Sequence, residues 1–210
     1  FDGIDINPIK VTSQELKDAL ASLNPELRTS LELAISRVRK VSEMSKPRDF
    51  IAELADGAEV QQRFQPIDSV GLYVPGGKAV YPSSVIMNVV PAQVAGVKKL
   101  AIATPGQAEF GGRPHPTVLA TAALLEVEDV YVIGGPAAVI AFAYGIPEIG
   151  LLPVNLVTGP GNIYVAAAKR ALRGIIGIDS EAGPTEIAIL ADETAVAADV
   201  ATDLISQAEH

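Results

Sequence analysis

The sequence contains no cysteine, few aromatic residues and a deficit of positive charge. Without cysteine, the chain cannot form disulfides, thiolate metal sites or a thiol nucleophile. Its 16 Lys and Arg against 25 Asp and Glu give a net charge of −9. This balance argues against nucleic acid or an anionic membrane as a partner, because both recruit basic surfaces.

Long apolar runs are also missing. No uninterrupted stretch reaches the roughly 18 apolar residues that identify a membrane span. The first residues, Phe1 to Asp5, lack the basic region and apolar block of a secretory signal. Together with the absence of cysteine, these features lead us to expect a cytoplasmic protein with no membrane partner.

The apolar content, in contrast, is high. Apolar residues make up 49% of the 210 residues and charged residues 20%, which predicts a globular core. Aromatics contribute only 5%, so Ala, Val, Ile and Leu must fill that core. Such small side chains favour helices packed on a parallel sheet.

Residues 1–68 are predicted to form an N-terminal helical segment. Thr12 and Glu15 have the spacing of a capping box, which begins a helix. Pro25 is suited to the first position of a second helix, which continues to about Ser45 and ends before Pro47.

From Ser69 onward, predicted strands and helices alternate. The strands are expected at 70–74, 99–104, 129–133, 155–158 and 187–190, and the helices at 83–97, 117–127, 136–144, 162–172 and 195–210. This alternation predicts an α/β fold with a doubly wound parallel sheet. We expect an incomplete Rossmann-like domain over residues 69–183 and the truncated beginning of a second, similar domain over residues 184–210.

Glycine and proline gather where the predicted strands end. Ligands of doubly wound sheets bind in the crevice outside the carboxyl ends of the strands. The sequence therefore predicts a binding crevice at this rim. Its loops are Pro75-Gly76-Gly77, Pro105-Gly106, Gly134-Gly135 and Gly159-Pro160-Gly161.

The last of these loops allows two interpretations. Gly159-Pro160-Gly161-Asn162 follows a strand and opens a helix, where backbone N–H groups and the helix dipole favour a phosphate. Tyr164 stands at the sixth position of the G-x-G-x-x-G pattern, so a standard dinucleotide fingerprint is absent. A tight connection between strand and helix would need no ligand, and both interpretations stay open here.

Two further side chains could take part in ligand binding. Tyr73, at the end of a predicted strand, could contact a ligand or be a half-buried tyrosine with a solvated hydroxyl. Thr185 offers a hydroxyl, and the neighbouring Glu186 could be a base or a charge at a strand edge. No histidine lies near Thr185 in the sequence, which argues against a nucleophilic threonine.

Gln207 and His210 are three residues apart on a predicted helix, so they share one face. An amide oxygen and an imidazole nitrogen in this arrangement could reach one metal ion together. A solvated polar face would show the same spacing, and glutamine is a poor metal ligand. The spacing alone leaves both interpretations open.

Taken together and in order, several segments resemble the histidinol dehydrogenase family. The similarity runs from about residue 30 to the end of the chain, and the ordered set is far more specific than any one motif. The matching segments are 71–77, 81–84, 87–88, 157–162, 164–169, 177–179, 182–187, 191–195 and 206–210.

The resemblance implies a zinc-containing homodimer that oxidises L-histidinol to L-histidine. The family performs two hydride transfers through an aldehyde and its hydrate, and consumes two NAD. Gln207 and His210 match zinc-binding positions whose contacts extend to the substrate, and Thr185 matches a hydroxyl at the substrate site. Tyr73 and Asn162 match positions that contact NAD.

The sequence also departs from the family pattern. Pro136 and Ala137 follow Gly134-Gly135, where the family has an Ala and a Gln that contacts NAD. The resemblance places the general bases and two further zinc ligands beyond residue 210, so the catalytic residues stay unassigned. Alternatively, these 210 residues act only as a nucleotide- or metal-binding module.

Overall fold

The computed structural model describes residues 7–77, 79–181 and 186–208. Its centre is a parallel sheet of five strands in the order β5-β4-β3-β6-β7. The strands are β3 (Ser69–Tyr73), β4 (Lys99–Thr104), β5 (Asp129–Val132), β6 (Leu156–Thr158) and β7 (Gly177–Ile178).

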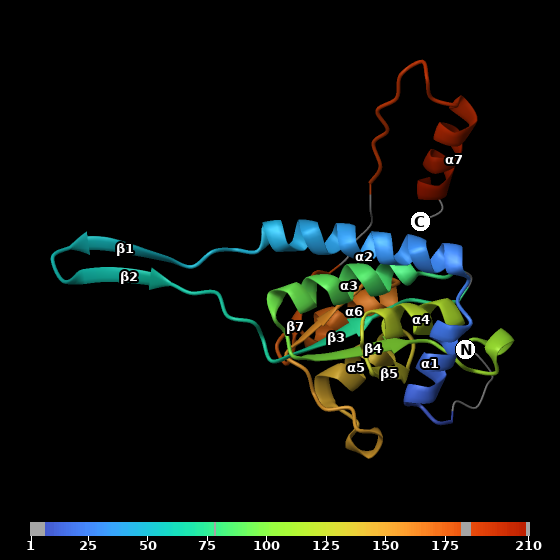
Figure 1. The fold of residues 1–210 in the computed structure, drawn as a ribbon, viewed down its shortest axis with the longest axis horizontal. Coiled ribbons are helices and arrows are strands. Elements are labelled where there is room, and N and C mark those ends of the chain that lie inside the picture. The colour runs from blue at the N-terminus through green and yellow to red at the C-terminus, as the bar shows by residue number, and fades with distance from the viewer. Residues whose placement is uncertain (1–6, 78, 182–185, 209–210) are drawn as a thin grey trace.

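Helices cover both faces of the sheet (Figure 1). One face carries α3 and α4, with α2 packed on α3 and α1 packed on α4, and the other carries α5 and α6. The helices are α1 (Ser13–Ala21), α2 (Pro25–Ser45), α3 (Pro82–Ala95), α4 (Pro116–Leu124), α5 (Gly135–Tyr144) and α6 (Ile163–Leu172).

Alternating side chains of the strands divide the core between these two faces. Val70, Leu72 and Ile102 lie in the cluster under α3 and α4. Tyr73 and Ala103 lie in the cluster under α5 and α6. This two-residue period follows from the pleat of a strand and buries β3 completely.

The path of the chain explains the strand order. It runs outward from β3 to β4 and β5, then returns to the other side of β3 with β6 and β7. This is the Rossmann order without its sixth strand, and it has a topological switch point between β3 and β6. The predicted α/β class and doubly wound parallel sheet are confirmed.

The N-terminal segment protects one edge of the sheet. Val11 donates its N–H to the carbonyl of Val130 at 2.8 Å, and Val132 donates to Ile9 at 2.7 Å. These antiparallel bonds satisfy part of the outer edge of β5, which would otherwise be open to pairing. The predicted capping box of Thr12 and Glu15 and the helix start at Pro25 are both confirmed.

The expectation of helix throughout residues 1–68 is wrong for a hairpin near its end. Strands β1 (Phe50–Ala55) and β2 (Ala58–Gln62) pair antiparallel and project from the body beyond α2 (Figure 1). The dipeptide Asp56-Gly57, with Gly57 at φ +74°, is the turn signal. Both strands are largely exposed and show no alternating burial pattern, so the period that identifies a half-buried strand is absent here.

The last predicted strand is also wrong. Residues 187–190 form no strand, and Leu190 is fully exposed. The fifth strand is instead β7, two residues that pair with β6 and are too short to show a pattern. The final helix is confirmed as α7 (Ala197–Ala208), which stands away from the sheet (Figure 1).

The division at residues 183 and 184 stays a prediction. Within the described ranges, every helix is too short or too polar to cross a bilayer.

Candidate functional site

The switch point brings the loops after β3 and β6 into contact. A Cβ atom on Gly159 would lie 2.0 Å from the carbonyl oxygen of Tyr73, and Gly159 has φ +120°. Both observations exclude any other residue at this position without movement of the backbone. The two predicted ligand loops therefore meet at Gly159 and Tyr73.

Tyr73 is buried, with 5% of its surface exposed. Its hydroxyl oxygen accepts the N–H of Gly135, at the start of α5, at 3.0 Å. Burial raises the pKa of Tyr73, and the bond from Gly135 opposes that rise. The phenol is therefore neutral near pH 7, and its own hydrogen can be donated to a ligand.

Asn162 is exposed and begins α6 as its N-cap. Its side-chain oxygen accepts the N–H groups of Tyr164 and Val165, both at 3.1 Å. This cap satisfies two of the donors that every helix start leaves without an intrahelical partner. The cap uses the oxygen of the Asn162 amide and not its Nδ2 group.

The first three rim loops also pack closely together. A Cβ atom on Gly76 or Gly134 would lie 2.9 Å or 2.8 Å from Pro105, in the loop after β4. Gly77 and Gly135 have positive φ angles and open space where a Cβ would lie. This rim offers room for the close backbone approach that an anionic ligand needs.

A cavity of about 460 Å³ opens beside the switch point on the α3 face of the sheet. Four polar side chains line it, those of Gln65, Asn88, Thr158 and Asp179, and the other lining residues are apolar. The Thr158 hydroxyl donates to Oδ1 of Asn88 at 2.7 Å. The volume lies within the usual range of small-molecule pockets.

Sequence reasoning missed an ion pair between a buried lysine and a partly exposed aspartate at this site. Lys169, on α6, is 2% exposed and its Nζ lies 2.7 Å from Oδ1 of Asp179, which follows β7. A signal was present, because Val165, Lys169 and Leu172 share the buried face of α6. A lysine on an apolar helix face requires a partner, but the spacing does not identify that partner.

Of the predicted metal and substrate residues, the structure describes only Gln207. Gln207 lies in the last turn of α7 and takes part in a polar interaction. Thr185 and His210 lie outside the described residues. In the part of the chain that the structure describes, no three His, Asp or Glu side chains gather as a metal-binding group.

Comparison with known proteins agrees with the motifs. The family model for histidinol dehydrogenase matches residues 1–210. Histidinol dehydrogenase of Thermobifida fusca is 60% identical over 210 residues, which are 100% of this chain and 48% of that protein. The enzyme of Corynebacterium efficiens is 57% identical over 210 residues, again all of this chain and 47% of that protein.

A solved structure shares the fold. The crystal structure of histidinol dehydrogenase from Elizabethkingia anophelis superimposes with a TM-score of 0.89 at 36% identity. That match covers 100% of this chain and 48% of the other. The chain spans about half the length of the curated relatives it matches. It belongs to the histidinol dehydrogenase family.

Proposed function

We propose that the protein carrying this chain is a zinc-containing, homodimeric enzyme that oxidises L-histidinol to L-histidine with two NAD. The family match supports the substrate. The observation that carries the proposal is the contact at the switch point between the loops of Tyr73 and Asn162. Doubly wound sheets bind their nucleotides at this position.

The residues of the rim fit an anionic dinucleotide. Gly77 and Gly135 leave space beside the backbone, and the start of α6 adds a favourable dipole. Tyr73 and Asn162 each keep a hydrogen-bond donor beyond the bonds they make within the protein. Such local donors would offset the net charge of −9, which by itself repels an anion.

For the metal, we propose Gln207 and His210 as two of the ligands. The described helix α7 includes Gln207 in its last turn, and continuation of this helix by two residues would place His210 on the same face. Bound zinc would polarise the substrate and hold it in position. We propose that Thr185 adds a hydroxyl contact to the substrate, and that other parts of the protein supply the bases.

A second candidate applies to these 210 residues in isolation. The chain covers 48% of its relative from Thermobifida fusca. In the described ranges, no three His, Asp or Glu side chains gather as a metal-binding group. We therefore propose that the isolated residues bind nucleotide or metal without turnover.

The test is NADH formation from L-histidinol by the intact protein, measured before chelation, after chelation and after zinc is restored. We expect two NADH per histidinol, loss of turnover on chelation and recovery with zinc. Full turnover after verified zinc removal would contradict the zinc assignment. The absence of turnover in well-folded, zinc-loaded intact protein would contradict the proposed reaction.

A further inference from the structure

Lys169 is a deeply buried charged residue near the rim, since its side chain is 3% exposed. A buried ammonium group is tolerated only when it is paired and hydrogen-bonded. Its Nζ donates to the carbonyl oxygen of Gly159 at 2.5 Å and to Oδ1 of Asp179 at 2.7 Å. The lysine therefore ties the second half of α6 to the loop that precedes this helix.

Asp179 completes the arrangement from the other side. Its Oδ2 accepts the N–H of Gly159 at 3.0 Å, while its Oδ1 also accepts the N–H of Ser180 at 2.7 Å. Both backbone polar groups of Gly159 thus bind to one ion pair. Gly159 also has φ +120° and lies against the backbone of Tyr73.

Stability alone does not require this pair. Val165 and Leu172 occupy the same face of α6, so an apolar side chain at position 169 would suit its surroundings. The Asp179 side chain is 34% exposed, and even fully buried ion pairs can often be replaced by apolar groups with a neutral or stabilising effect. An ion pair can instead specify one geometry, and here both of its partners bind the backbone of Gly159.

We propose that Lys169 and Asp179 are positioning residues, whose ion pair holds Gly159 so that the loop from Gly159 to Asn162 is preorganised for its ligand. This inference rests on the proposed function in that NAD is taken as the ligand. The loop is held at both ends, at Gly159 by the ion pair and at Asn162 by the cap of α6. Preorganisation lowers the cost of ordering the loop when the ligand binds.

The test compares the intact protein with the double variant K169M/D179N, which removes both charges and leaves no unpaired buried ion. The matched control is Arg170→Met, because Arg170 lies on the same helix and pairs with Glu181 at 2.7 Å but is 71% exposed. Three quantities are measured: hydrogen exchange of the Gly159 amide, the Kd for NAD, and kcat and KM with histidinol.

In the double variant we expect the Gly159 amide to exchange at least about tenfold faster, the factor expected from one charge-assisted hydrogen bond. The Kd and KM for NAD should rise by a similar factor while kcat changes by less than about threefold. Arg170→Met should change each value by less than about twofold, as expected for an exposed pair. A folded double variant with exchange and NAD affinity like those of the parent would overturn the proposal.

Two further cases must be distinguished: a double variant that does not fold, and a parent protein that does not bind NAD. If the double variant does not fold, Asp179→Asn alone is measured, and unchanged exchange and unchanged Kd in that variant would equally overturn the proposal. If the parent protein neither binds NAD nor oxidises histidinol, the proposed function fails. The exchange rate of the Gly159 amide then still decides whether the ion pair holds the loop.

Discussion

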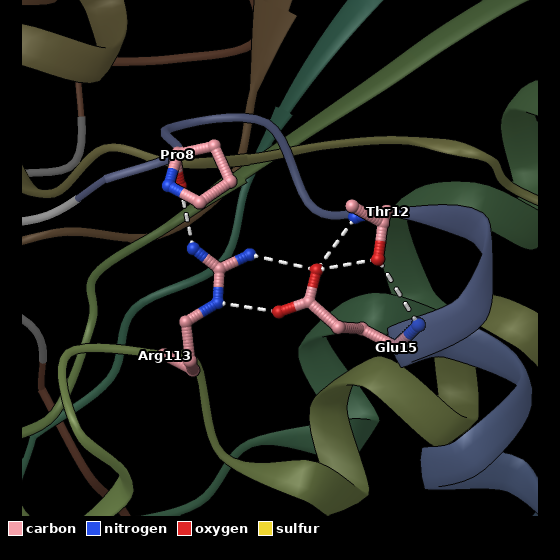
Figure 2. A network of polar contacts seen from close by, with 4 residues as sticks. All are labelled: Pro8, Thr12, Glu15 and Arg113. Atoms are coloured by element: carbon pink, nitrogen blue, oxygen red, sulfur yellow. Dashed lines mark hydrogen bonds and ion pairs between the residues drawn. The ribbon is translucent and has the colours of Figure 1, made fainter.

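Glu15 and Arg113 form a two-pronged ion pair between α1 and the loop before α4 (Figure 2). Nε of Arg113 donates to Oε1 at 2.7 Å, and Nη2 donates to Oε2 at 3.1 Å. Oε2 also accepts the N–H and the hydroxyl of Thr12, at 2.7 and 2.8 Å. Since Arg113 also donates to the Pro8 carbonyl, this network anchors the N-terminal segment to the sheet domain.

The first prediction concerns Glu15→Gln. Partial burial of Glu15 favours the protonated form, but the bonds from Thr12 and Arg113 outweigh it and lower its pKa below the ordinary 4.5. The charged form therefore stabilises the fold above pH 4.5, and this contribution is lost as pH falls through the lowered value. We expect the variant to lose about 1–2 kcal/mol at pH 7.

Urea denaturation at pH 7 and near pH 3 measures this difference, which should shrink at the lower pH. Glu32→Gln is the matched control, because Glu32 pairs with Arg28 on the exposed surface of α2. It should cost less than about 0.5 kcal/mol. A loss for Glu15→Gln that does not depend on pH would contradict the role of its charge.

The second prediction concerns Gly71→Ala in the central strand. A Cβ atom there would lie 2.4 Å from the ring of Phe142, on α5. The packed core cannot absorb this overlap freely, so we expect a loss of about 1–3 kcal/mol. Gly71→Ala combined with Phe142→Leu should recover part of it. Gly174→Ala, at a position with open space, is the control, and equal losses at both positions would refute the packing argument.

Much of the fold could be predicted because its signals are local. The strand over Lys99–Thr104 agrees with β4 at both ends. Thr12 and Pro25 each begin a helix by the chemistry of a single turn. The hairpin of β1 and β2 was missed because neither strand has a buried face, which removes the period on which strand prediction relies.

The candidate site could be predicted less completely, because it depends on tertiary contacts. Its place at the strand ends follows from the Gly and Pro clusters, and the resemblance assigned Tyr73 and Asn162. The pair of Lys169 and Asp179 connects a helix to the segment after the next strand, and no sequence period encodes that contact. The hydrogen bond from the Gly135 N–H to the Tyr73 hydroxyl likewise could not be predicted from sequence, because it depends on how the sheet brings the two loops together.

The third prediction concerns Tyr73→Phe. The change removes the acceptor of the Gly135 N–H, which should cost about 1 kcal/mol of unfolding free energy. If the same hydroxyl contacts NAD, the Kd for NAD in the intact protein should also rise by about tenfold. Thermal unfolding and NAD titration measure the two effects separately. A stability loss with unchanged Kd would assign the hydroxyl to the fold alone.

The last prediction separates the two roles of Asn162. Aspartate caps a helix as well as asparagine does, and its charge suits the helix start, so Asn162→Asp should leave stability nearly unchanged. The new carboxylate would repel the phosphates of NAD, and we expect the Kd for NAD to rise by about tenfold. Asn24→Asp makes the same change at the cap of α2, where Asn24 accepts two backbone N–H groups in the same way.

Titration of NAD into both variants of the intact protein provides the measurement, with salt as a further variable. The effect at position 162 should weaken as ionic strength rises, because screening reduces repulsion between partly exposed charges. The control variant, Asn24→Asp, should bind NAD like the parent protein at every salt concentration. Equal affinities in the two variants would mean that Asn162 begins a helix and does not contact the cofactor.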